Sequence, residues 1–122
     1  MDLGPLLLRA AAELQQRAET AGVVLRITPS ETPVAVGHPY LFDVMTHLID
    51  NAIRVSPPGG TVAVDAQAIG DDVLIWVRDE GSGIPAENVE AQRIIEANGG
   101  ALWPECMPPL GCTYVVRLPN TR

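Results

Sequence analysis

The stretch LFDVMTHLIDNAIR, residues 41–54, repeats apolar residues at spacings of three and four. Such spacing gathers the apolar side chains on one face of a helix. The apolar face holds Leu41, Val44, Met45, Leu48, Ile49 and Ala52. The polar face holds Asp43, His47, Asp50, Asn51 and Arg54. The stretch therefore predicts an amphipathic helix whose apolar face covers a core.

The residues directly after this helix predict a hairpin of two antiparallel strands. PPGG, at residues 57–60, breaks the chain before TVAVDAQA, at residues 61–68, where apolar residues alternate with more polar ones. That alternation is typical of a half-buried strand. Gly70, Asp71 and Asp72 then form a short turn into VLIWVRD, at residues 73–79.

The C-terminal part of the chain predicts a helix and a second hairpin. The helix follows the Gly-rich loop DEGSGIP, at residues 79–85, and its residues Val89, Ile94 and Ile95 are expected to face inward. Asn98-Gly99 predicts a left-handed cap at its end. ALW, at residues 101–103, and TYVVRL, at residues 113–118, predict the two strands of the hairpin.

The N-terminal part predicts a further helix and further strands. Apolar residues recur at helical spacing from Leu7 to Ala21, with Asp2 as a helix cap and Gly22 as the stop. VVLRIT, at residues 23–28, predicts a strand, and residues 34–36 predict a short one between prolines. We therefore expect one α+β domain over residues 1–122, a two-layer α/β sandwich. In it, a mixed, mostly antiparallel sheet of about five strands is covered on one face by three helices.

The composition narrows the range of partners. Acidic residues outnumber basic ones by 15 to 8, and the eight basic residues are arginines scattered singly, so we expect no basic stripe that would neutralise a nucleic acid backbone. The apolar N-terminal stretch follows no basic segment and is interrupted by Arg9 and Glu13, which predicts neither a signal peptide nor a membrane span. We therefore expect a cytoplasmic domain without membrane contact, and we expect Cys106 and Cys112 to be free thiols.

The polar helix face and the Asp-x-Gly-x-Gly of residues 79–83 are, taken singly, typical of a solvated surface and a flexible turn. Their order is more specific. HLIDNAIRVSPPGGTV (47–62), VRDEGSGIP (77–85), IIEANGGALW (94–103) and GCTYVVRLP (111–119), with a hairpin between the first two, follow one another here. This series resembles the ATP-binding domain of sensor histidine kinases, in the superfamily of type II topoisomerase and mismatch-repair ATPases. The leading DLGPLL (2–7) resembles the segment that joins this domain to the dimerisation helices.

The resemblance implies a site for ATP or ADP with Mg²⁺. In the phosphate half, Asn51 matches the second Asn of the family's Asn-x-x-x-Asn-Ala and would hold Mg²⁺, a hard cation that favours oxygen ligands. Arg54 stands where a basic residue faces phosphate, and His47 replaces the first Asn. A histidine cannot simply replace an amide as a magnesium ligand, so the resemblance implies weak metal binding.

The resemblance assigns the adenine half to the Asp-x-Gly-x-Gly loop. Asp79 would accept a hydrogen bond from the adenine amino group, while Gly81 and Gly83 would let the backbone pass close to the base. Ile84 would line the adenine pocket. An alternative use of the polar helix face, as a transition-metal site of Asp43, His47 and Asn51, supplies only one good nitrogen ligand.

Two further departures from the family concern catalysis. Family members carry a long lid and a second Gly-rich motif that cradles the phosphates, whereas here Pro85 is followed almost at once by a helix whose start carries Glu87 and Glu90. His38 precedes Pro39 and His47 precedes Leu48, so neither has the acidic neighbour of the family's phosphoacceptor. No residue is assigned a catalytic role.

These observations predict the adenine-nucleotide-binding catalytic domain of a two-component sensor histidine kinase, without its lid and weak or inactive alone. Phosphoacceptor and dimerisation helices and a response regulator are its expected partners. The alternative is a non-catalytic docking module that kept the fold to bind a kinase or a response regulator. A third interpretation, an unrelated α/β binding domain, requires the ordered matches to be accidental.

Overall fold

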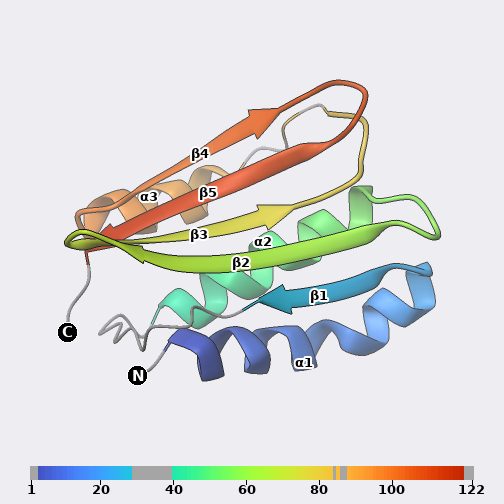
Figure 1. Cartoon of the computed structure of the whole chain (residues 1–122), viewed down its shortest axis with the longest axis horizontal. Helices are drawn as coiled ribbons and strands as arrows, with labels where there is room; N and C mark the ends of the chain where they lie inside the picture. The colour runs from blue at the N-terminus through green and yellow to red at the C-terminus, as the bar shows by residue number, and fades with distance from the viewer. Residues whose placement is uncertain (1–2, 29–39, 84, 86–87, 120–122) are drawn as a thin grey trace.

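The structure is a computed structural model that describes residues 3–28, 40–83, 85 and 88–119 (Figure 1). The elements along the chain are α1 (Leu3–Ala21), β1 (Val24–Thr28), α2 (Leu41–Val55), β2 (Thr61–Ile69), β3 (Asp72–Arg78), α3 (Val89–Ala97), β4 (Ala101–Cys106) and β5 (Cys112–Pro119). The strands form a five-stranded sheet in the order β1-β2-β3-β5-β4. Only β1 pairs in parallel with its neighbour, and the other three pairs are antiparallel.

The predicted α+β sandwich is confirmed. The three described helices lie on one side of the sheet (Figure 1), and the core is built from their apolar faces and one face of the strands. Strand β3 shows the alternation that produces this arrangement, because Val73, Ile75 and Val77 are buried while Leu74 and Trp76 between them are only half-buried. The half-buried residues belong to the open face of the sheet.

Helix α2 agrees with its predicted periodicity. All six residues of the predicted apolar face are at most 2% exposed. Before the helix, burial raises the pKa of the Tyr40 phenol, so this side chain stays neutral near physiological pH. The apolar face of α2 thus fixes the helix against the sheet and orients its polar face away from the core.

Replacing Leu48 by Ala should lower the free energy of unfolding by about 2–5 kcal/mol, because this 1% exposed side chain would leave a cavity in the core. Urea denaturation followed by circular dichroism measures the change. Leu8→Ala is the matched control, since Leu8 on α1 is 53% exposed and its truncation removes little buried surface. Equal losses for the two variants would contradict the assigned core.

Three details of the N-terminal half bear on the sequence predictions. Leu3, Leu6 and Leu7 are at most 1% exposed, so the residues that resemble a joining segment form the start of α1 and belong to the core. Gly22, with a φ of 73°, ends α1 as predicted. The predicted cap Asp2, the short strand at residues 34–36 and His38 lie outside the described residues.

Two predictions about the C-terminal half are wrong. Val89, expected to face inward, is 56% exposed, because α3 begins at this residue and presents Ala91 and Ile95, one turn apart, to the core. Cys106 and Cys112, expected to be free thiols, form a disulfide with a Cα–Cα distance of 4.0 Å. They lie directly opposite one another in the register of β4 and β5. The expectation of free thiols rested on the predicted cellular compartment and took no account of strand register.

No described helix is both long and apolar enough to cross a membrane.

Candidate functional site

Asp79 is held at the end of β3 by backbone groups. Its side chain is 3% exposed, and Oδ1 accepts hydrogen bonds from the backbone N–H groups of Gly81, at 2.9 Å, and Cys112, at 3.0 Å. The backbone N–H of Asp79 in turn donates to the Cys112 carbonyl oxygen at 2.8 Å. Both side-chain bonds use Oδ1, so within the described part of the chain Oδ2 remains the oxygen for a further donor.

The glycines that follow Asp79 are required by close packing. Gly83 has a φ of 85°, and a Cβ there would lie 2.5 Å from the Cα of Pro108. A Cβ on Gly81 would lie 3.0 Å from the carbonyl oxygen of Val55, at the end of α2. The loop therefore passes between the end of α2 and the turn that joins β4 to β5, where a side chain would collide with backbone.

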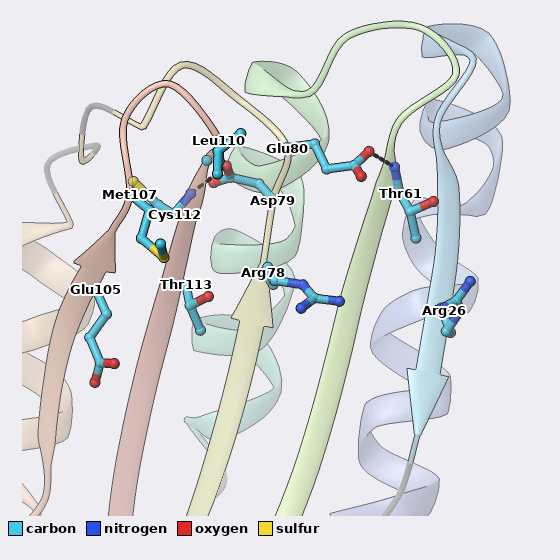
Figure 2. Close-up of a pocket in the computed structure, with 11 residues that line it drawn as sticks. Arg26, Thr61, Arg78, Asp79, Glu80, Glu105, Met107, Leu110, Cys112 and Thr113 are labelled. Carbon is cyan, nitrogen blue, oxygen red and sulfur yellow. Dashed lines mark hydrogen bonds between the residues drawn. The ribbon is translucent and has the colours of Figure 1, made fainter.

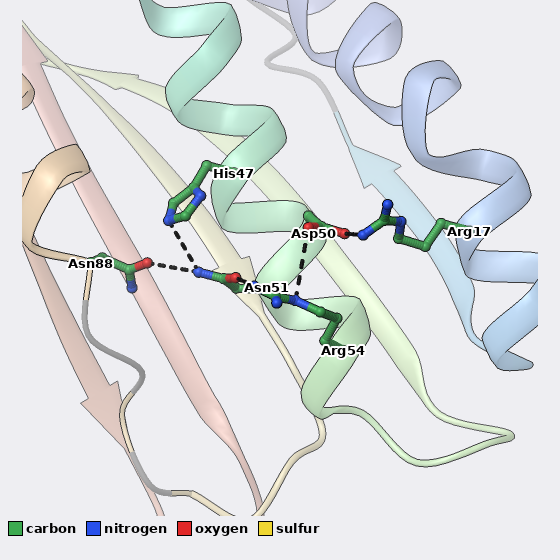
Figure 3. Close-up of polar contacts among 6 residues, drawn as sticks. All are labelled: Arg17, His47, Asp50, Asn51, Arg54 and Asn88. Atoms are coloured by element: carbon green, nitrogen blue, oxygen red, sulfur yellow. Dashed lines mark hydrogen bonds and ion pairs between the residues drawn. The ribbon is translucent and has the colours of Figure 1, made fainter.

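Asn51 is the centre of a polar network on α2, although the periodicity placed it on the solvent face. It is only 8% exposed, and Figure 3 shows it beside the side chains of His47, Arg54 and Asn88. Its Nδ2 donates to Asn88 Oδ1 at 2.9 Å and lies 3.3 Å from His47 Nε2. Its Oδ1 accepts a hydrogen bond from the Arg54 guanidinium. Asn88, which sequence reasoning missed, thus ties the segment before α3 to α2.

Arg54 is also held by charge. Asp50 Oδ2 lies 3.8 Å from Arg54 Nε, and Asp50 Oδ1 lies 2.8 Å from Arg17 Nη1 (Figure 3). The Arg54 side chain is 61% exposed, so these ion pairs are screened by solvent and hold it weakly. Turning Arg54 toward an anion would therefore lose little from these ion pairs, but it would also break the hydrogen bond to Asn51.

The structure places the predicted site residues on helix α2 and in the loop that meets its C-terminal end. His47, Asn51 and Arg54 lie together on α2, and the loop of Asp79, Gly81 and Gly83 meets its C-terminal end, where Ser56 Oγ accepts a hydrogen bond from the Glu80 N–H at 3.1 Å. From His47 to Ser56 the helix rises about 13 Å, at about 1.5 Å per residue. The remaining predicted site residue, Ile84, lies outside the described residues, as does Glu87, which was expected to repel the phosphates.

A small groove of about 230 Å³ separates α2 from α3. Val44, Ala91 and Ile94 make it largely apolar, while Asp43, His47 and Glu90 supply its polar groups. Ligand pockets typically enclose about 300–1,000 Å³, so this groove is small for a nucleotide. Within residues 3–28, 40–83, 85 and 88–119, no group of three or more His, Cys, Asp or Glu side chains could hold a metal ion.

A cavity of about 500 Å³ lies on the open face of the sheet, at the same end as the Asp79 loop (Figure 2). Arg26 and Arg78 face it together with Glu80 and Glu105. Glu80 Oε2 accepts a hydrogen bond from the Thr61 N–H at 2.6 Å. Charges of both signs therefore line the cavity, which gives it no preference for an anion.

Residues 38–122 match the family of histidine kinase-, DNA gyrase B-, and HSP90-like ATPases. The adaptive-response sensory kinase SasA of Synechococcus elongatus is 27% identical over 145 residues, which cover 97% of this chain and 38% of that protein. The chain thus spans well under half the length of this relative.

Two solved structures share the fold. Full-length ShkA in complex with AMPPNP has a TM-score of 0.87 at 21% identity, covering 98% of this chain and 30% of that one. Histidine kinase ThkA in complex with the response regulator protein TrrA has a TM-score of 0.81 at 17% identity, covering 99% of this chain and 41% of that one. At these identities the likeness establishes the fold.

Proposed function

Because this chain belongs to the family of histidine kinase-, DNA gyrase B-, and HSP90-like ATPases, we propose that it binds adenine nucleotide as one domain over residues 1–122. The bound nucleotide would lie along α2, as in the ATP-binding domain of a sensor histidine kinase. The adenine half of the site is kept, and the phosphate half is weakened. The single observation that supports this most is the buried Asp79 carboxylate.

Asp79 is prepared to recognise adenine. Two backbone N–H groups hold Oδ1 and thereby fix the direction of Oδ2, which accepts the hydrogen bond from the adenine amino group. A hydrogen bond to a charged acceptor contributes about 1.5–3 kcal/mol, so the adenine amino group would gain from this oriented oxygen. Gly81 and Gly83 keep the backbone beside the base free of side chains, and the family resemblance assigns Ile84, which lies outside the described residues, to the adenine pocket.

The phosphate half has few groups that bind anions. Arg54 is the basic residue on the polar face of α2, whereas Asp43 and Glu90 place negative charge beside the groove next to His47. The second Gly-rich motif of the family has no counterpart in this sequence. The alignment with SasA is 145 residues long and covers 97% of the 122 residues of this chain, about 118, so about 27 aligned positions have no residue here. A lost lid would account for a gap of this length.

Magnesium fits this site poorly. The amide oxygen of Asn51 is of the type that Mg²⁺ prefers, but it accepts a hydrogen bond from the Arg54 guanidinium, whose positive charge repels a divalent cation. His47, beside it, is a nitrogen ligand that suits other metals better. We therefore expect only weak binding of Mg²⁺ at Asn51.

The isolated chain should not phosphorylate itself, because neither His38 nor His47 has the family's acceptor pattern and no lid excludes water from the transfer. Incubation with radiolabelled ATP should leave the protein unlabelled, while an intact sensor kinase in the same assay becomes labelled. Acid-labile label on either histidine, lost in the matching His→Gln variant, would overturn this expectation.

A second candidate function is docking without nucleotide. The observation that favours it is that the Asn51 side chain is already hydrogen-bonded within the protein. Its Oδ1 accepts from Arg54, and its Nδ2 donates to Asn88. In that case the domain binds a kinase or a response regulator, and histidine kinase ThkA, which shares the fold, has been solved in complex with the response regulator protein TrrA. In either case, dimerisation and phosphoacceptor helices and a response regulator are the partners we propose for the complete signalling protein. Calorimetric titration with ADP separates the two functions, because a docking module gives no binding heat.

A further inference from the structure

The turn that joins β4 to β5 is closed by a covalent bond. Cys106 and Cys112 are the last pair in the register of the two strands, and their disulfide closes the loop of residues 107–111. Within it, the Met107 N–H donates to the Gly111 carbonyl oxygen at 2.9 Å. The ends of the turn are thus held both by the disulfide and by a backbone hydrogen bond.

This turn packs directly on the loop that we assign to adenine. Cys112 exchanges two hydrogen bonds with Asp79, one of them to the carboxylate oxygen Oδ1 (Figure 2). Gly111 has a φ of 117°, and a Cβ there would collide with the Asp79 carbonyl oxygen. Pro108 makes the close approach to Gly83 described above. The turn therefore touches both ends of the Asp79-x-Gly81-x-Gly83 motif.

From this contact we infer that the Cys106–Cys112 disulfide is a redox control of the nucleotide site. In the oxidised protein the bond holds Cys112 against Asp79 and keeps the carboxylate aimed at adenine. In the reduced protein the turn is free to move away, Oδ1 loses a donor, and the nucleotide is bound less tightly. This inference rests on the proposed function, because it assigns regulation to the same site.

The two cysteines differ in exposure. Cys112 belongs to the core and is 3% exposed, whereas Cys106 is only partly buried. We therefore expect a thiolate to attack Sγ of Cys106, the more exposed of the two residues.

The reducing co-reactant is a dithiol. One of its sulfurs, as thiolate, bonds to Cys106 Sγ while the disulfide bond breaks and Cys112 leaves as a thiolate that takes up a proton. The second thiol of the reductant then loses its proton and attacks the reductant sulfur that is bonded to Cys106. Cys106 is released as a thiolate, which takes up a proton. The protein gains two electrons and two protons, and the dithiol becomes a cyclic disulfide.

Reduction of the 122-residue chain with dithiothreitol should raise the Kd for ADP by at least about fivefold, the lower end of typical coupling between two sites. Calorimetry measures Kd for both forms, thiol titration counts the free cysteines, and circular dichroism checks folding. Cys106→Ser should bind ADP like the reduced protein under both conditions. Met107→Ala is the control, because it changes an exposed residue of the same turn and keeps the disulfide.

The outcomes separate this inference from the proposed function. If the oxidised chain binds no ADP, the proposed function fails, and hydrogen exchange still tests the switch, because reduction should speed exchange at the Gly81 and Cys112 amides. Equal ADP affinity and equal exchange in both forms overturn the inference. Two free thiols after treatment with oxidised glutathione, or global unfolding on reduction, also overturn it.

Discussion

Replacement of Asp79 by Asn is expected to abolish measurable binding of adenine nucleotides. The asparagine Oδ1 can still accept the N–H groups of Gly81 and Cys112, so the loop keeps its geometry. The other carboxylate oxygen becomes an NH₂ group, which opposes the adenine amino group donor to donor. Losing a hydrogen bond to a charged acceptor costs about 1.5–3 kcal/mol, which weakens binding roughly ten- to hundredfold.

Calorimetric titration with ADP measures the loss, and thermal unfolding shows whether the variant is folded. Asp65→Asn is the matched control, because Asp65 lies exposed on β2, away from the loop. This variant should bind ADP as the unchanged chain does. Equal affinity of Asp79→Asn and the unchanged chain would remove Asp79 from the site.

ATP is expected to bind no more tightly than ADP, and Mg²⁺ should have little effect on either. In an intact family member the terminal phosphates gain from backbone N–H donors, the metal and a basic side chain. Here the second Gly-rich motif is absent from the sequence, and Glu90 lies in the first turn of α3, beside the groove. Charge-assisted hydrogen bonds contribute about 1.5–3 kcal/mol each, so the loss of two weakens ATP by roughly a hundredfold or more.

Parallel titrations with ATP and ADP, with and without MgCl₂, test this expectation. Glu90→Gln serves as the companion variant, because removing this charge should favour ATP over ADP relative to the unchanged chain without touching the adenine loop. Micromolar Mg-ATP binding at least tenfold tighter than ADP would show that another segment supplies the phosphate cradle.

Much of the fold follows from local sequence patterns. The apolar spacing of α2 is that of a helix with one face in a core, and all six expected residues are buried. The turn at Gly70 joins β2 and β3 as expected, since short turns between alternating strands depend on neighbouring residues. The Asp-x-Gly-x-Gly motif is equally local, and the order of motifs along the chain identified the family.

The sequence prediction failed where distant residues meet. Val89 fits the apolar spacing of α3. Whether its side chain is buried depends on where the helix begins and on which elements pack against it. Periodicity placed Asn51 on the polar face of α2, but it could not show that Asn88, 37 residues away, covers this residue. A helical period describes one element at a time, so it cannot reveal which side chain another element brings to that face.

The sequence alone determined the α+β architecture, the amphipathic helix and the position of Asp79 in a Gly-rich loop after a strand, because each depends on residues close together in the chain. Only the tertiary structure decided the partners of that site. The pairing of Cys106 with Cys112 needed the register of β4 against β5, and the contact of Cys112 with Asp79 joins residues 33 positions apart. Strand register and loop packing are set by the burial of the whole core, so no local sequence pattern predicts them.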